Sequence, residues 1–130
     1  MSEPQWIEEN VVIDIHDAQL AEHGGLGGVR DRGLLQSALQ APVNAWHYVE
    51  PVPDLCALAA LYGVRLAKNH PFSDGNKRTA AVITELFLRV NRLSITASDE
   101  EMYPIIMGIA DGSMGEKDFA EWLRLHTSSI

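Results

Sequence analysis

Apolar residues recur every three or four positions along most of this 130-residue sequence, which is the period of an α-helix with one buried face. Two stretches show the period most clearly, a Leu- and Ala-rich one over residues 53–69 and a second one over residues 76–90. Only the short piece 93–96 alternates like a strand. The pattern predicts a mostly α-helical fold whose two central helices form a hairpin, with at most a minor short β element.

Two helical segments are predicted before this hairpin. Residues 8–23 place apolar side chains, Val11 among them, on roughly one side, and a glycine cluster ends the segment. His16 within it is expected to make a structural hydrogen bond. Asp31 is placed to cap the next helix. The stretch 42–53 begins and ends with proline and is the least regular part of the chain.

Two more helices are predicted after the hairpin. Ser98 and Glu101 have the spacing of a capping box at the start of the first one. The second is expected over residues 116–126, with a tail that frays behind it. The strand-like piece 93–96 is expected to pair with residues near Trp6.

Composition limits the function classes without selecting one. With 46% hydrophobic residues, residues 1–130 are long enough to form a single domain with a real core. A formal net charge of −8 argues against nucleic acid as a direct partner, because such binding depends on clustered basic residues. The sequence has neither a membrane-spanning apolar run nor a signal peptide at its start, so we expect a cytoplasmic protein without a membrane partner. The single cysteine, Cys56, excludes a disulfide framework.

The run of residues 70–79, His-Pro-Phe-Ser-Asp-Gly-Asn-Lys-Arg-Thr, lies at the bend of the predicted hairpin. Pro71 disfavours a helical conformation for His70, so the imidazole is expected where the helix gives way to a loop, able to take a proton near neutral pH. Asp74 is a hard oxygen ligand of the kind that Mg²⁺ accepts singly. Phe72 is expected to pack inward and hold the loop.

The second half of this run has the chemistry of an anion site. Gly75 allows a close backbone approach, and the helix that starts at about Asn76 offers unpaired amides and the positive end of its dipole. Lys77 adds a point charge, and Arg78 adds a planar fork for phosphate oxygens. Cations in a first helical turn oppose the helix dipole, so their presence there indicates a bound anion.

The residues from His70 to Arg78 resemble the signature of the Fic/Doc family, H-P-F-x-[D/E]-G-N-[G/K]-R, with every specified position filled. Similarity to the amino-terminal region of the Doc, or death-on-curing, branch is carried by residues 13–17, 24–31 and 33–39. Lys77 departs from the glycine of most AMP-transferring members, and the Doc branch shares this lysine. The resemblance implies a compact Fic/Doc-type helical bundle over nearly the whole chain.

The resemblance also implies a function, that of the toxin of a type II toxin–antitoxin pair. In the Doc branch the terminal phosphate of magnesium-bound ATP goes to a threonine of elongation factor Tu, and translation stops. ATP and Mg²⁺ would then be the cofactors and elongation factor Tu the substrate. A Phd-like antitoxin would be the protein partner, with a helix docked in a groove near the signature.

Roles for single residues follow from the same resemblance. His70 would deprotonate the attacking hydroxyl, and Asp74 would hold magnesium. Phosphate binding and charge neutralisation would fall to Gly75, Asn76, Lys77 and Arg78. Lys68 and Asn69 are expected either to face the nucleotide or to form a polar helix end. Residues 43–52 are expected either to line up the target's backbone, as a flap does in Fic-like folds, or to be a packed connector.

Three other functions stay open. AMP transfer to a protein hydroxyl needs the same His70 and Arg78 but a glycine-like phosphate hole. A catalytically inactive Fic-like binding module is opposed by the intact His70 and Asp74. A metal-dependent nuclease built on His70, Asp74 and Asn76 is opposed by the acidity of the chain and by the lack of a second ligand cluster.

Overall fold

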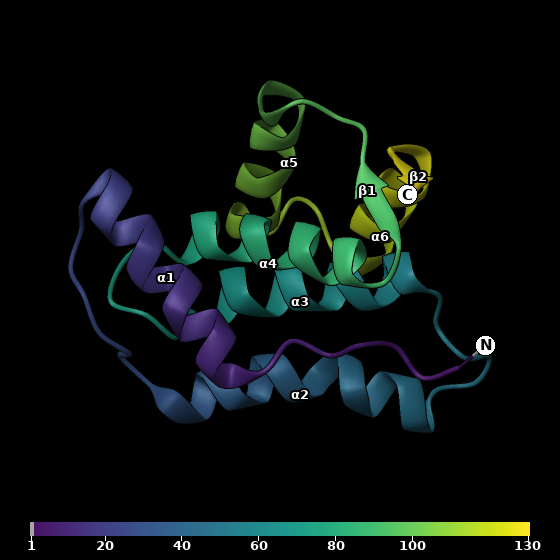
Figure 1. Ribbon diagram of the computed structural model, residues 1–130, viewed down its shortest axis with the longest axis horizontal. Helices are drawn as coiled ribbons and strands as arrows, with labels where there is room; N and C mark the ends of the chain where they lie inside the picture. Colours follow the sequence, from purple (N-terminus) through teal and green to yellow (C-terminus); the bar gives the residue numbers. More distant parts are fainter. Residues whose placement is uncertain (1) are drawn as a thin grey trace.

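The computed structural model describes residues 2–130, which form six helices and one two-stranded sheet (Figure 1). The elements are α1 (Glu9–His23), α2 (Arg32–Tyr48), α3 (Leu55–Asn69), α4 (Asn76–Val90), β1 (Leu93–Ile95), α5 (Asp99–Asp111), α6 (Glu116–Leu125) and β2 (Thr127–Ser129). Within residues 2–130, none of the helices has the length and apolarity needed to cross a bilayer. The predicted mostly α-helical fold with a minor β element is confirmed.

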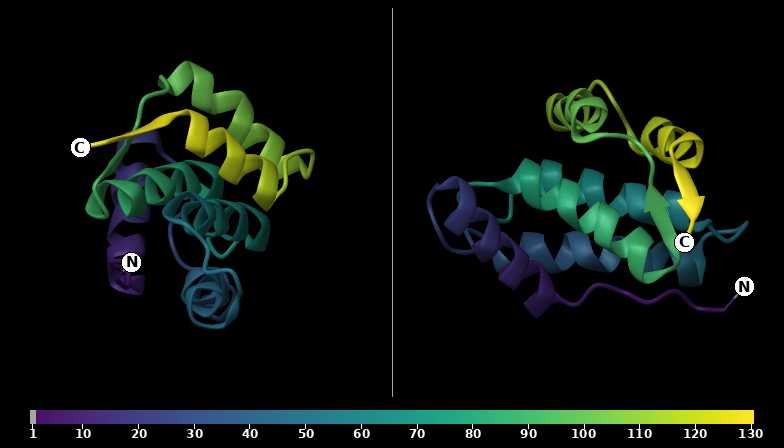
Figure 2. Two further views of the ribbon diagram at one scale, coloured as in Figure 1. Left: turned by 90° about the vertical axis from the view of Figure 1, so that its right-hand side faces the viewer. Right: turned by 45° about the horizontal axis from the view of Figure 1, so that its top comes forward.

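Helix α3 lies at the centre and contacts α2, α4 and α6 along its length. In the end-on view of Figure 2, α2 lies on one side of α3, and α5 and α6 lie on the other. Gly63 lets the helices approach closely, because a Cβ atom there would lie 2.6 Å from Thr84 Oγ1 and 2.9 Å from the ring of Phe119. The predicted hairpin of α3 and α4 is therefore confirmed, and it forms the core of the molecule.

Side-chain caps fix where three of the helices begin. Asp31 accepts a hydrogen bond from the backbone N–H three residues further on at 3.0 Å, and Asp54 does the same at 2.8 Å. Ser98 and Glu101 form a reciprocal capping box at the start of α5. The caps predicted at Asp31 and Ser98 are confirmed. The cap at Asp54 starts α3 at Leu55, two residues after the predicted start at Pro53.

Helix α2 is longer than the sequence pattern predicted. It continues through Pro42 to Tyr48, so most of the expected irregular stretch is helical. Proline removes one N–H from the helix, but the ring of Pro42 is buried, and Trp46 beyond it packs against the core. Tertiary packing of the apolar face therefore outweighs the local cost of the proline.

The predicted partner of β1 was wrong. This strand pairs antiparallel with β2 at the end of the chain, with Ile95 opposite Thr127, and not with residues near Trp6. Trp6 instead stacks on Phe87 with a centroid distance of 6.0 Å. Helices α5 and α6 return the chain beside β1, so the tail that was expected to fray is held by backbone hydrogen bonds, including Ile130 N–H to Arg92 O at 3.1 Å.

Candidate active site

The signature loop, defined as residues 70–75, joins the end of α3 to the start of α4, as predicted. A second loop, the glycine segment of residues 24–31 between α1 and α2, lies at the same end of the molecule, at the left of Figure 1. Val29 and Phe72 form an antiparallel β-bridge between the two loops. Pro71 O accepts from the backbone N–H groups of Arg30 and Asp31 at 2.8 and 3.0 Å. Two loops far apart in sequence are thus joined by main-chain hydrogen bonds.

His70 is the residue at which α3 ends. Its backbone lies in the left-handed region, with φ 49° and ψ 54°. The hydrogen bonds at this residue go to its backbone carbonyl, and the residue is exposed to solvent. The prediction that the helix gives way to a loop here is confirmed, and the residue is open to solvent.

Asp74 is also exposed, and the glycine segment lies against its carboxylate. Oδ1 accepts from the N–H of Gly75 at 2.8 Å. A Cβ atom on Gly25, whose φ is +126°, would lie 2.8 Å from Asp74 Oδ2 and 3.0 Å from Leu20 Cδ2. Only glycine fits this position without displacing the carboxylate.

His16, on α1, contacts the signature loop at two residues, Phe72 and Asp74. Its ring is stacked on that of Phe72, with a centroid distance of 3.7 Å and an angle of 8°. Its Nε2 lies 2.7 Å from Asp74 O, and because a carbonyl oxygen only accepts, Nε2 must carry the proton. Both residues are 1% exposed, so Phe72 packs inward as predicted. The structural hydrogen bond expected of His16 is confirmed, whereas Val11, expected on the buried side of α1, is 37% exposed.

Asn76 begins α4 and uses its side chain inside the protein. Its Oδ1 accepts from Phe72 N–H and its Nδ2 donates to Phe72 O, both at 3.0 Å. A phosphate group would therefore meet the backbone N–H of Asn76 and not its carboxamide. Gly75, at φ 77° and ψ 16°, makes the turn into the helix.

The start of α4 has the groups expected of an anion site. Its first helical hydrogen bond runs from Thr79 N–H to Gly75 O at 3.0 Å, which leaves the amides of residues 76–78 without an intrahelical acceptor. Lys77 and Arg78 are exposed on this first turn. Backbone donors, the helix dipole and two cations thus lie beside His70 and Asp74 in one loop.

The two residues before His70 differ in their surroundings. Asn69 donates from Nδ2 to Leu34 O at 3.1 Å, so its side chain is turned toward α2. That contact fits the polar-helix-end alternative for Asn69. Lys68 is exposed.

The sequence alone assigns no role to Arg30. Its guanidinium donates to the backbone carbonyls of His70, at 2.8 and 2.6 Å, and of Asn69, at 3.2 Å. No spacing rule links residue 30 to residue 70, and the only signal in the sequence was that residues 24–31 resemble the Doc branch. Arg32, two residues on, instead forms a two-point ion pair with Glu9 at 3.0 and 3.1 Å.

The expected target-docking role of residues 43–52 is not supported by their position. These residues end α2 and lead to the first turn of α3, whereas His70 follows the last turn. Helix α3 has 15 residues, so the two ends are about 22 Å apart at 1.5 Å per residue. The segment that does lie alongside the signature loop is the glycine segment.

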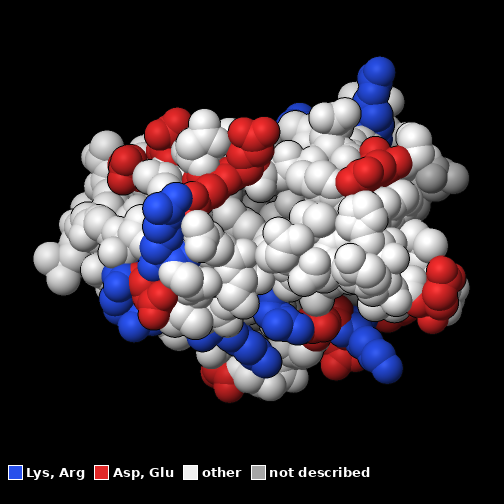
Figure 3. All heavy atoms as spheres, turned by 90° about the horizontal axis from the view of Figure 1, so that it is seen from below, with Lys and Arg blue, Asp and Glu red and all other residues white. Residues whose placement is uncertain are grey.

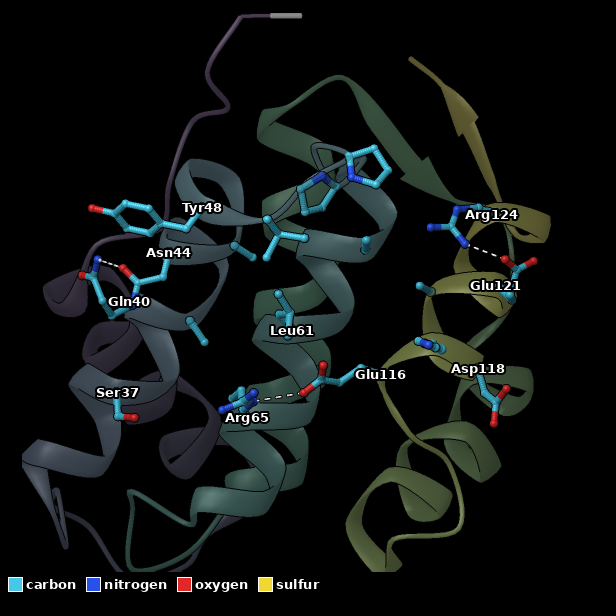
Figure 4. Close-up of a pocket in the computed structure, with 18 residues that line it drawn as sticks. Ser37, Gln40, Asn44, Tyr48, Leu61, Arg65, Glu116, Asp118, Glu121 and Arg124 are labelled. Atoms are coloured by element: carbon cyan, nitrogen blue, oxygen red, sulfur yellow. Dashed lines mark hydrogen bonds and ion pairs between the residues drawn. The ribbon is translucent and has the colours of Figure 1, made fainter.

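A groove of about 1170 Å³ lies away from the signature loop, between α2, α3 and α6 (Figure 4). Ala41, Leu61 and Ala120 are among its apolar lining residues. An ion pair between Arg65 and Glu116, at 3.1 Å, crosses between α3 and α6 toward one end. None of residues 70–79 lines this groove. The groove is therefore separate from the candidate active site at the signature loop, despite its size.

Two other features limit what the molecule can do. Cys56 is 6% exposed, and burial raises the pKa of its thiol, which disfavours the reactive thiolate. On the face drawn in Figure 3, most Lys and Arg side chains lie in the lower half, with Asp and Glu side chains among them. That face has no continuous basic track for a nucleic-acid backbone.

Comparison with known proteins gives a consistent result. Residues 6–88 match the model of the Fic/DOC family. Protein kinase doc of Escherichia phage P1 is 36% identical over 118 residues, which cover 91% of this chain and 92% of that protein. Toxin Doc of Mycolicibacterium smegmatis is 38% identical over 84 residues, 65% of each chain. The matched region contains both loops of the site described above.

Proposed function

This chain belongs to the Fic/Doc family, and on that premise we propose that it is a Doc-like toxin that transfers the terminal phosphate of ATP to a protein hydroxyl. The phage P1 relative is named a protein kinase, and the mycobacterial relative is named a toxin. The observation that carries the proposal is the signature loop, which presents His70 and Asp74 beside the open amides of α4.

In the proposed reaction, His70 accepts the proton of the attacking hydroxyl. A bond forms between that oxygen and the terminal phosphorus, the bond to the bridging oxygen breaks, and ADP leaves. Charge on the transferred group is stabilised by the amides of residues 76–78 and by Lys77 and Arg78. Phe72 and His16 keep the loop in place while this occurs.

The residues present fit Mg²⁺ and ATP as cofactors. Asp74 is an exposed carboxylate, and within residues 2–130 no group of three or more His, Cys, Asp and Glu side chains is arranged to hold a metal. A single carboxylate suits Mg²⁺, which keeps several waters and shares substrate phosphates. When bound there, Mg²⁺ would neutralise charge on the phosphate oxygens.

We propose elongation factor Tu as the substrate, with a threonine hydroxyl as acceptor. The proposal rests on the resemblance to the Doc branch. Phosphorylation of this factor would arrest translation, and the protein would then act in the cytoplasm. A Phd-like antitoxin is the proposed partner that restrains it.

AMP transfer is the second candidate, because it uses the same His70 and Arg78. Lys77 favours phosphate transfer, since a long exposed cation on the first turn of α4 replaces the glycine of the AMP-transferring members. Replacing Lys77 by glycine would reopen the phosphate hole and is expected to increase AMP transfer at the expense of phosphate transfer.

The test is transfer of label from ATP to purified elongation factor Tu in the presence of Mg²⁺. We expect label from the γ-phosphate and none from the α-phosphate, and loss of transfer by at least about 100-fold in His70→Ala and Asp74→Ala. Ser73→Ala, an exposed change in the same loop, serves as the control for loop integrity. Transfer of the α-label by the wild-type protein, or full activity of His70→Ala, would contradict the proposal.

A further inference from the structure

We propose that Arg30 is the positioning residue for His70, because its guanidinium holds the backbone of His70 in the left-handed conformation that sets the direction of the imidazole. The inference rests on the proposed function, since it assigns a role within the same site. It concerns the glycine segment, whose part in the chemistry the signature alone does not reveal.

Arg30 contacts the backbone of three consecutive residues where α3 ends. Its Nε donates to His70 O at 2.8 Å, and one Nη donates to His70 O at 2.6 Å and to Asn69 O at 3.2 Å. The backbone N–H of Arg30 donates to Pro71 O at 2.8 Å. A single residue therefore fixes the carbonyls on both sides of the Cα atom of His70 and the one that follows.

His70 needs such support because its conformation is unfavourable. A non-glycine residue in the left-handed region is disfavoured by contact of Cβ with its own backbone, and a residue before proline prefers the extended region. Within residues 2–130, the only non-glycine residues with positive φ are His70 and Arg92. A strained residue of this kind persists only where its surroundings determine it.

The end of α3 also lacks the usual main-chain closure. Helices α1, α2, α4, α5 and α6 each end with a hydrogen bond from the N–H of the cap residue, and among residues 2–130 none is made by the cap residue of α3, His70. The next residue, Pro71, has no N–H to donate. The guanidinium of Arg30 instead donates to the carbonyls of Asn69 and His70 at this helix end, and its charge complements the negative end of the helix dipole.

The fork of arginine is needed for this role. Two nitrogens of the guanidinium reach His70 O while one of them also reaches Asn69 O, a geometry that the single ammonium of lysine does not reproduce. Without Arg30, the peptide between His70 and Pro71 is free to relax toward the extended conformation that proline favours. The imidazole would then point away from the attacking hydroxyl.

The first test compares Arg30→Ala and Arg30→Lys with Arg32→Ala in the transfer assay. Arg32 is a matched control, because it is exposed, lies two residues away and pairs with Glu9 alone. We expect Arg30→Ala to lower kcat by at least about tenfold, with KM for ATP changed by less than about twofold. Arg30→Lys should recover only part of kcat, and added methylguanidinium should partly restore Arg30→Ala.

The second test reads the backbone of residue 70 without any activity. In the wild-type background, His70→Gly should melt at a higher temperature than His70→Ala, because glycine accepts positive φ and alanine does not. In the Arg30→Ala background this difference should be lost, because residue 70 is then free to leave the left-handed region. The comparison remains informative even if the protein transfers no phosphate, so it separates this inference from the proposed function.

Two results would overturn the positioning role. One is a melting difference between His70→Gly and His70→Ala that is the same with and without Arg30. The other is an active protein in which Arg30→Ala and Arg32→Ala have equal kcat. Absence of transfer by the wild-type protein together with a melting difference that depends on Arg30 would contradict the proposed function and leave the positioning of residue 70 supported.

Discussion

His70 and Asp74 expose their reactive groups, while the residues between and behind them are buried or hydrogen-bonded. The ring of Phe72 stacks on that of His16, and the backbone of Phe72 is hydrogen-bonded to the carboxamide of Asn76. The carbonyl of His70 is held by Arg30, on the glycine segment. This division lets one short loop keep a fixed backbone and still expose His70, the proposed base, and Asp74, the proposed metal ligand.

A single methyl group on the glycine segment should disturb Asp74, the proposed metal ligand. Gly25→Ala would place a Cβ atom 2.8 Å from Asp74 Oδ2, so the carboxylate has to move. We expect the Mg²⁺ concentration for half-maximal transfer to rise by roughly tenfold, the lower end of the loss typical when a supporting contact of a metal ligand is removed. A titration of transfer rate against Mg²⁺ measures this directly.

Gly24→Ala is the control for this experiment. Gly24 also has a positive φ, of +78°, but a Cβ atom there would meet nothing within 4 Å. With ψ 175°, Gly24 lies in a backbone region that is essentially open to glycine alone, so the control should lose about 1–3 kcal/mol of stability and keep its Mg²⁺ requirement. If both variants show the same Mg²⁺ requirement as the wild-type protein, the contact between the glycine segment and Asp74 has no functional role.

For single residues, the sequence predicted which residues form the site better than it predicted the contacts that their side chains make. The inward Phe72 and the end of the helix at His70 followed from the residues themselves, because proline and a large aromatic ring have strong local preferences. The side chain of Asn76 and the role of Arg30 did not, because each depends on a contact with a backbone group that only the folded chain brings near.

Among the elements, the link between the start of α3 and the end of α6 carries a pH dependence. Arg124 contacts both carboxylate oxygens of Asp54, at 2.7 and 3.1 Å. Hydrogen bonding from Arg124, together with the backbone N–H of Ala57, holds the pKa of Asp54 below its ordinary value. The stabilisation is therefore present above the unfolded-state pKa and is lost as the pH falls through the folded-state value.

Asp54→Asn isolates this charge, because asparagine caps a helix about as well as aspartate. We expect the variant to lose about 0.5–1 kcal/mol of unfolding free energy at pH 7. The deficit should shrink as the pH falls below about 4, where the unfolded aspartate becomes protonated. Urea unfolding of both proteins between pH 7 and pH 3 gives the comparison, and a deficit that does not change with pH would show that the ion pair is not its cause.

The helices were largely predictable because their apolar period and caps are local features. Helix α4 begins and ends at the predicted residues. The pattern failed where long-range packing decides: Pro42 lies inside α2, and the polar residues Thr127–Ser129 form β2 only because α6 delivers them to β1. Neither outcome has a signature within its own stretch of sequence.

Across the whole molecule, the signature loop and the groove between α2, α3 and α6 are separate features that share α3. The groove reaches Arg65, little more than one turn before His70. Its apolar lining suits one face of an amphipathic helix. We therefore propose it as the docking site of the Phd-like antitoxin, although the expected groove was nearer the signature and none of residues 70–79 lines this one.

A charge placed in this groove should block neutralisation and leave toxicity intact. Ala41→Arg introduces a long cation among the lining residues, whereas Ala18→Arg makes the same change on the exposed surface of α1. With a Phd-like antitoxin that neutralises the wild-type protein coexpressed, cells carrying Ala41→Arg should stop growing and cells carrying Ala18→Arg should grow. Equal growth with both variants would place the antitoxin elsewhere.

The most direct measurement of the central claim is a crystal structure of the protein with Mg²⁺ and a non-hydrolysable ATP analogue. The account predicts the phosphates at the amides of residues 76–78, with Mg²⁺ on the carboxylate of Asp74 and the terminal phosphate facing His70. A nucleotide bound in the groove between α2, α3 and α6, or bound with its phosphates away from the start of α4, would contradict it.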